Sequence, residues 1–105
     1  MARFGLVGKM TALPGQRDTL LALLLQAADL VADAPGCEQW IVHTEPSDPD
    51  GIWVTEVWRD EADHAASLSL TGVPEIIGRA RPLIAAMGER FTLEPVGGKG
   101  LPPAS

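Results

Sequence analysis

The sequence predicts an α+β domain whose elements follow the order β-α-β-β-α-β. Three observations support this order: a leucine-rich helical pattern near the N-terminus, two alternating strand patterns joined by a turn-rich segment, and a last strand pattern before a glycine- and proline-rich tail. On one antiparallel four-stranded sheet, this order is the ferredoxin-like arrangement. The 105 residues suit one domain. We expect residues 1–96 to form it and residues 97–105 to be a flexible tail.

The first strand and the first helix are predicted from periodicity. Residues 3–11 alternate as a half-buried strand does, and Pro14-Gly15-Gln16 marks a turn. A helix then extends from about residue 16 to residue 34. Its apolar arc is wide enough to indicate contact with a second subunit or a ligand cavity as well as a sheet, although deep burial alone would also explain it. The central stripe consists of Leu20, Leu23, Leu24, Ala27, Leu30 and Val31.

A hairpin is predicted next. Residues 37–45 and 52–58 are strand patterns, and the segment Pro-Ser-Asp-Pro-Asp-Gly at 46–51 is a dense turn cluster between them. Trp53 and Trp58 are an odd number of residues apart, so they fall on opposite faces of the strand unless its register breaks.

The C-terminal half predicts two helices and a strand. Asp60 is a suitable N-cap for a short helix over about residues 61–70. Pro74 suits the first turn of a further helix that continues to Ile84, and Pro82 should kink or shorten it. Residues 90–95 are the expected fourth strand.

Composition excludes several classes of protein. The formal net charge of −6 disfavours nucleic acid as a partner. No apolar run reaches the ~18 residues of a membrane span. The single cysteine, Cys37, cannot form an internal disulfide, and we expect a cytoplasmic protein. No zinc-type spacing is present; Asp48-Pro49-Asp50-Gly51 is superficially similar to a calcium loop, but a hairpin turn explains it better.

The most informative short stretch is Glu56-Val57-Trp58, at the end of the third strand. An indole there offers an N–H donor beside a carboxylate, where a pocket could form. The alternative is that Trp58 only packs in the core.

Three segments together resemble the antibiotic biosynthesis monooxygenase (ABM) family of the dimeric α+β barrel superfamily. They are Leu13-Pro14-Gly15-Gln16, Ala34-Pro35-Gly36-Cys37 and Glu56-Val57-Trp58, within a likeness that covers roughly residues 3 to 95. The resemblance implies a homodimer whose two sheets face each other, with a pocket between sheet and helices in each subunit. It also implies oxidation of a small aromatic phenol, quinol or anthrone by O2 without a metal or other cofactor.

The resemblance suggests site residues as well. Trp58 would face the pocket and donate to the substrate anion, His64 would be the base, and Trp53 would face the partner sheet. Relatives commonly carry a histidine where this chain has Ser67 and Leu68, and His64 lies one turn earlier on the same helix face. We expect substrate contacts from Trp40, Glu56, Ser67 and Leu68.

Some alternatives remain open at this point. His64 could instead be solvated at an exposed helix start, and His43 has the position of a structural residue. The chain contains no asparagine and no tyrosine. The asparagine of the haem-degrading branch is therefore missing, so haem degradation is not expected. A non-catalytic dimeric module for an apolar small molecule is the second hypothesis, and a pure interaction domain with a filled pocket is a weaker third.

Overall fold

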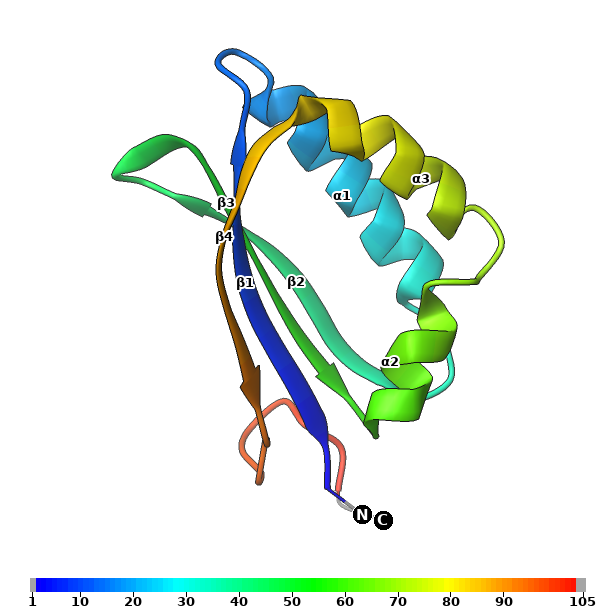
Figure 1. Cartoon of the computed structure of the whole chain (residues 1–105). Helices are drawn as coiled ribbons and strands as arrows, with labels where there is room; N and C mark the ends of the chain where they lie inside the picture. The colour runs from blue at the N-terminus through cyan, green and yellow to red at the C-terminus, as the bar shows by residue number, and fades with distance from the viewer. Residues whose placement is uncertain (1, 104–105) are drawn as a thin grey trace.

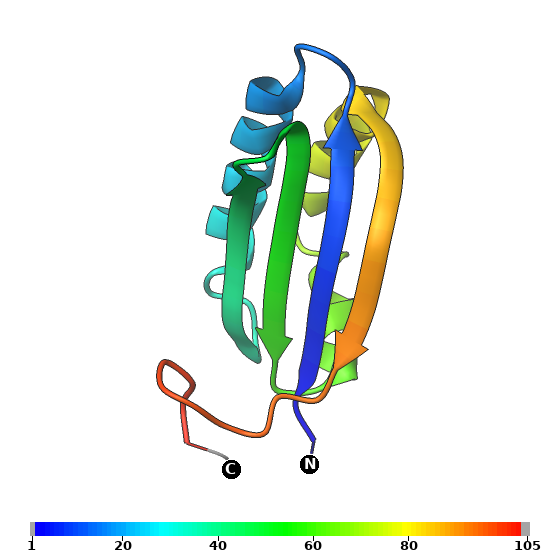
Figure 2. The same cartoon turned by 90° about the vertical axis from the view of Figure 1, so that its left-hand side faces the viewer.

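The computed structural model describes residues 2–103 and confirms the α+β ferredoxin-like order. Four antiparallel strands form one sheet in the order β2-β3-β1-β4 (Figure 2). The helices cover one face of this sheet and leave the other face uncovered (Figure 1). The elements are β1 Phe4–Ala12, α1 Arg17–Val31, β2 Cys37–Glu45, β3 Asp48–Trp58, α2 Glu61–Ser67, α3 Val73–Ala80, the 3₁₀ turn η1 Arg81–Leu83 and β4 Ile84–Leu93.

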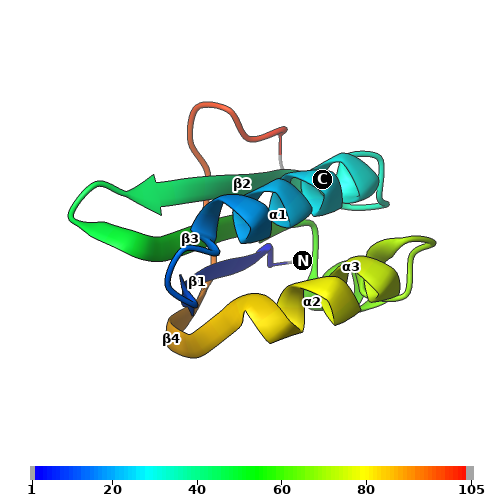
Figure 3. The same cartoon turned by 90° about the horizontal axis from the view of Figure 1, so that it is seen from above.

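The core lies between the sheet and two helices, α1 and α3, that run side by side (Figure 3). Side chains alternate along each strand, so every second residue of β3 enters the core. Leu20, Ile52 and Trp58 are the largest fully buried side chains. Burying one large apolar side chain contributes roughly 1.5–3 kcal/mol to the free energy of unfolding. The packing of the sheet against α1 and α3 therefore accounts for much of the stability of the domain.

Helix α1 confirms most of the predicted leucine stripe. Five of its residues are buried: Leu20, Leu23, Leu24, Ala27 and Val31. Leu30 was expected in the same stripe but is 39% exposed, and the flanking Leu25 is 52% exposed. The helix ends at Val31, three residues before its predicted end, and the chain then turns through Gly36 at a φ of 78°.

The predicted turn cluster is much shorter than expected. Only Pro46 and Ser47 form the turn, because β3 already begins at Asp48. Lys9 of β1 holds this end of the hairpin: its Nζ lies 2.7 Å from a Glu45 oxygen and 3.0 Å from an Asp48 oxygen. These contacts raise the pKa of Lys9 and lower the pKa of both carboxyl groups. An extra segment of β3 around Pro49 is accommodated as a register shift against β2.

Strand β4 begins six residues earlier than predicted. Ile84 was expected to end a helix, yet it is the first residue of the strand. The prediction that Pro82 shortens the helix is confirmed, because α3 ends at Ala80 and is followed by η1. Alanine and glycine have low strand propensity, so the segment 85–88 carries no strand signal. Pairing with β1 from Ala12 to Gly5 overrides that propensity.

The short helix α2 is held against the start of β2. The Asp60 side chain accepts a hydrogen bond from the Asp63 N–H at 2.8 Å, which confirms the predicted N-cap. The Asp63 carboxylate lies over Gly36, where a Cβ atom would come within 2.0 Å of it, and pairs with Arg59 at 2.7 Å. Gly36 therefore provides the surface against which the Asp63 side chain of α2 packs.

Replacing Gly36 with alanine should destabilise the domain. The positive φ and the collision with Asp63 together predict a loss of about 1–3 kcal/mol in the free energy of unfolding, measured by urea denaturation. Gly78 is the matched control: it lies within α3 and a Cβ there meets nothing within 4 Å. Gly78→Ala should stabilise by about 0.5–1 kcal/mol. Equal urea-denaturation midpoints for Gly36→Ala and wild type would contradict this role of Gly36 in positioning α2.

Candidate functional site

A cleft runs between the helix-facing side of the sheet and the three helices. It has three compartments, of about 520, 270 and 130 Å³. Met10 and Met87 line both of the larger two, Leu24 lines the largest and the smallest, and His64 lines the two smaller ones. Because neighbouring compartments share walls, we treat them as one continuous cleft. Most of its lining is apolar, as is usual for small-molecule sites.

Glu56, Trp58 and His64 form the polar centre of the cleft. The Trp58 indole N–H donates to Glu56 Oε1 at 2.9 Å, and His64 Nε2 lies 3.7 Å from that same oxygen. The side chains of Glu56 and His64 are each only 15% exposed. A largely buried carboxylate needs hydrogen-bond or charge partners; Trp58 supplies the hydrogen bond, and His64 would supply a charge when its ring is protonated.

His64 points into the cleft because α2 and two aromatic rings hold it there. Its ring centroid lies 5.2 Å from that of Phe4 and 5.8 Å from that of Trp58, the latter in an edge-on arrangement. The Asp60 cap and the packing of Asp63 against Gly36 fix the start of α2. The histidine is therefore part of a packed aromatic group, and the solvated alternative does not describe it.

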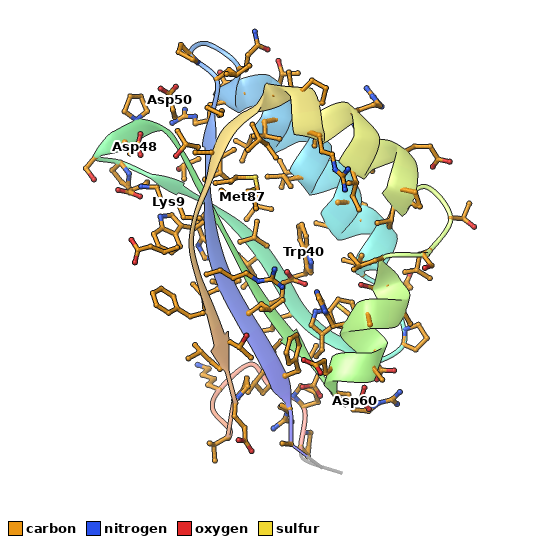
Figure 4. The ribbon with its side chains drawn as sticks, in the orientation of Figure 1. Lys9, Trp40, Asp48, Asp50, Asp60 and Met87 are labelled. Atoms are coloured by element: carbon orange, nitrogen blue, oxygen red, sulfur yellow. The ribbon has the colours of Figure 1, made fainter. Side chains whose placement is uncertain are left out.

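Three further residues expected at the site also border the cleft. Trp40, on β2, projects into the space between sheet and helices (Figure 4). Ser67 is buried, lines the same compartment and donates its hydroxyl to the His64 carbonyl at 2.6 Å. Leu68 is half exposed and lines both of the smaller compartments.

Trp58 occupies a different position from the one expected of a direct donor. It is fully buried, and the three compartments are lined by other residues. Since its N–H is already bonded to Glu56, its influence on the cleft passes through that carboxylate.

The outer face of the sheet carries Trp53 of β3, which was expected to point away from the pocket, and His43 of β2, which was expected to be structural. Trp53 donates to Glu45 at 2.7 Å, and His43 is hydrogen-bonded to Thr55 at 2.9 Å. The odd spacing of the two β3 tryptophans therefore separates them as predicted.

Sequence reasoning missed the β4 side of the cleft. Met87 and Arg90 both line the 270 Å³ compartment, and Met87 extends from β4 toward the helices (Figure 4). Their odd spacing would put them on opposite faces of a regular strand. A register shift between the Gly8 and Met10 pairings inserts one extra β4 residue and brings both to the same face.

Cys37 and the acidic residues do not suggest other chemistry. Burial, followed by the charges of Glu56 and Glu38, raises the pKa of the Cys37 thiol, which keeps it from acting as a thiolate nucleophile. Within residues 2–103, no three His, Cys, Asp or Glu side chains converge as a metal site requires. In the same part of the chain, no helix has both the length and the hydrophobicity for crossing a membrane.

The fold and its helix-covered cleft define a small α+β domain of the ferredoxin-like class. The family model for antibiotic biosynthesis monooxygenase matches residues 3–76. The chain belongs to this family. No curated protein matches the sequence.

Solved structures agree with this assignment. A protein of Chloroflexus aurantiacus J-10-fl, named for the same family, is 49% identical, with a TM-score of 0.88 over 95% of this chain and 99% of that one. A similarly named protein of Deinococcus radiodurans is 22% identical, with a TM-score of 0.77 over 90% and 94%. SnoaB of Streptomyces nogalater, a cofactor-independent oxygenase solved in a mutant form, is 16% identical, with a TM-score of 0.78 over 92% and 96%. The last two similarities concern the fold alone.

Replacing Trp58 with phenylalanine should test the buried bond. The substitution removes the N–H that Glu56 accepts and part of a fully buried ring. A loss of about 1.5–3 kcal/mol in unfolding free energy is expected, measured by urea denaturation at pH 7.

Trp53→Phe is the matched control for this test. It removes the same atoms from the outer face, where Lys9 and Ser47 still contact the Glu45 carboxylate, so the loss should be smaller. Equal losses for the two variants would show that burial of the Glu56 bond has no special energetic role.

Proposed function

We propose that the protein is a cofactor-independent monooxygenase that oxidises an aromatic phenol, quinol or anthrone with O2. The observation that carries this proposal is the position of His64 and Glu56, which together line two compartments of an otherwise largely apolar cleft. An apolar cleft suits a planar ring system, and an imidazole beside a carboxylate suits proton removal. Membership of the monooxygenase family supports the same reaction class.

His64 is the proposed base. When its imidazole accepts the substrate proton, the Glu56 carboxylate at 3.7 Å lies close enough to stabilise the imidazolium that forms. The bond from Trp58 keeps that carboxylate oriented, so Trp58 is a positioning residue in this proposal. Trp40, Ser67 and Leu68 would shape the pocket around the rings.

The proposed reaction balances with O2 as the only oxidant. Deprotonation of an anthrone-type CH2 group gives an electron-rich anion, which passes one electron to O2. The substrate radical and superoxide combine into a peroxide at the same carbon. Cleavage of the O–O bond with loss of the remaining C–H then leaves a carbonyl and releases water. One oxygen atom enters the product, and the substrate supplies all the electrons.

SnoaB, described as a cofactor-independent oxygenase, has the same fold at low identity and is consistent with this reaction. The alternative of a non-catalytic binding module predicted no base within reach of the pocket. His64 on the cleft wall favours the enzyme. A cytoplasmic location remains a prediction from the single cysteine.

Oxygen uptake tests the proposal directly. With a panel that includes dithranol and 1,4-naphthoquinol, at least one compound should consume O2 faster than in buffer, and His64→Ala should reduce that rate by about 10²–10⁴-fold. His43→Ala, on the outer face, should retain the wild-type rate. Absence of any protein-dependent uptake, or an unchanged rate in His64→Ala, would refute the assignment.

We also propose that two copies associate through the outer face of the sheet. Strand alternation places Ile41, Phe91 and Leu93 on this face, and they are 44%, 48% and 54% exposed. A face this apolar suits contact with a second copy better than contact with water.

Sedimentation equilibrium should therefore give twice the 11.1 kDa chain mass. Phe91→Glu should shift the distribution to the monomer, because it would bury an unpaired charge in the contact. Leu25→Glu, on the solvent side of α1, should leave the dimer intact. A monomeric wild type, or dissociation by Leu25→Glu instead, would exclude this interface.

A further inference from the structure

The charged residues of the cleft do not follow the charge of the whole chain. The protein has a net charge of −6. The three compartments are nevertheless lined by three basic residues, Lys9, Arg81 and Arg90, and by one carboxylate, Glu56. A local excess of positive charge in an acidic protein attracts an anion to that place.

The three basic residues are not equally available to a ligand in the cleft. The Lys9 ammonium lies over Trp53 on the outer face of the sheet, where Glu45 and Asp48 pair with it. Among residues 2–103, no ion pair or side-chain hydrogen bond engages Arg81 or Arg90. Glu56, the one carboxylate among the residues that line these compartments, already accepts the Trp58 N–H and lies beside His64.

Arg90 is the cation that shares a compartment with the proposed base. It lines the 270 Å³ compartment together with Glu56 and His64, whereas Arg81 lines the 520 Å³ compartment. The bulge in β4 turns Arg90 to this side of the sheet. Its partner in register on β1 is Gly8, which has no side chain to fill the space beside it.

We propose that the ligand of the cleft is an aromatic acid whose carboxylate is bound by Arg90. A guanidinium holds a carboxylate through two parallel N–H bonds, which fixes orientation as well as charge. Anchored there, the rings lie between Met10 and Met87, and the reacting carbon comes beside His64. The identification of this ligand as a substrate rests on the proposed function, but its binding can be measured without turnover.

Two fluorescent probes of matched size test the proposal. Anthracene-9-carboxylate and 9-anthracenemethanol share one ring system and differ in charge. The wild type should bind the carboxylate about 5–20-fold more tightly than the alcohol, and that preference should shrink as NaCl rises from about 50 to about 500 mM. Arg90→Gln should lose most of the preference while its affinity for the alcohol stays within about twofold of wild type.

Two arginine variants are the controls. Arg79→Gln makes the same charge change on α3, at a residue that lines none of the three compartments, and should keep the preference. Arg81→Gln should keep it as well. Equal binding of the two probes by the wild type, no binding of the carboxylate at 1 mM, an undiminished preference in Arg90→Gln, or a loss in Arg81→Gln would each overturn the proposal.

The two proposals fail separately. If the carboxylate preference depends on Arg90 but no compound drives oxygen uptake, the anion site stands and the monooxygenase assignment falls. If neutral quinols and their carboxylated counterparts are oxidised with equal kcat/KM, and the probes bind equally, only the anion site falls. Circular dichroism spectra that match wild type would show that each variant is folded.

Discussion

The alternation of side chains along β3 is the constraint on which the rest of the structure depends. Ile52, Val54, Glu56 and Trp58 all face the helices, so a carboxylate stands in a row of core residues. An unpartnered carboxylate there would be costly to bury. The Trp58 N–H meets that requirement with a hydrogen bond, and the His64 ring lies 3.7 Å from the same oxygen, so these contacts create the polar centre of the cleft. Core packing and site geometry are thus one arrangement in this protein.

The position of His64 depends on contacts that lie outside the cleft. Its helix has only seven residues, too few for stability from helix propensity alone. Three contacts hold the helix and its histidine in place: the Asp60 cap, the packing of Asp63 against Gly36, and the ring of Phe4 against His64. The cleft is less constrained on the β4 side, where Met87 is 70% exposed and Arg90 has no ion partner among the described residues. A packed polar centre therefore lies beside an exposed wall that carries Met87 and Arg90.

Most of the fold could be predicted from local signals. Pro-Gly pairs mark the ends of α1, Asp60 marks the start of α2, and Pro82 marks the end of α3, because each limits the local backbone directly. Strand β4 could not be predicted in full, since Ala85-Ala86-Met87-Gly88 has no strand propensity and is extended only because β1 pairs with it. The short turn at Pro46 likewise brings Glu45 and Asp48 against Lys9, which lies far away in the sequence.

The sequence by itself determined the order of the elements and the opposite faces of Trp53 and Trp58, because these follow from periodicity and spacing within short segments. Its motifs also carried the family resemblance. Only the tertiary structure decided that the Trp58 N–H belongs to Glu56, that His64 points into the cleft, and that Met87 and Arg90 share its wall. Each of these depends on where separate segments meet, and in β4 on a bulge that reverses the expected face. Local patterns set which side of an element is apolar, but contacts between elements set which polar groups meet.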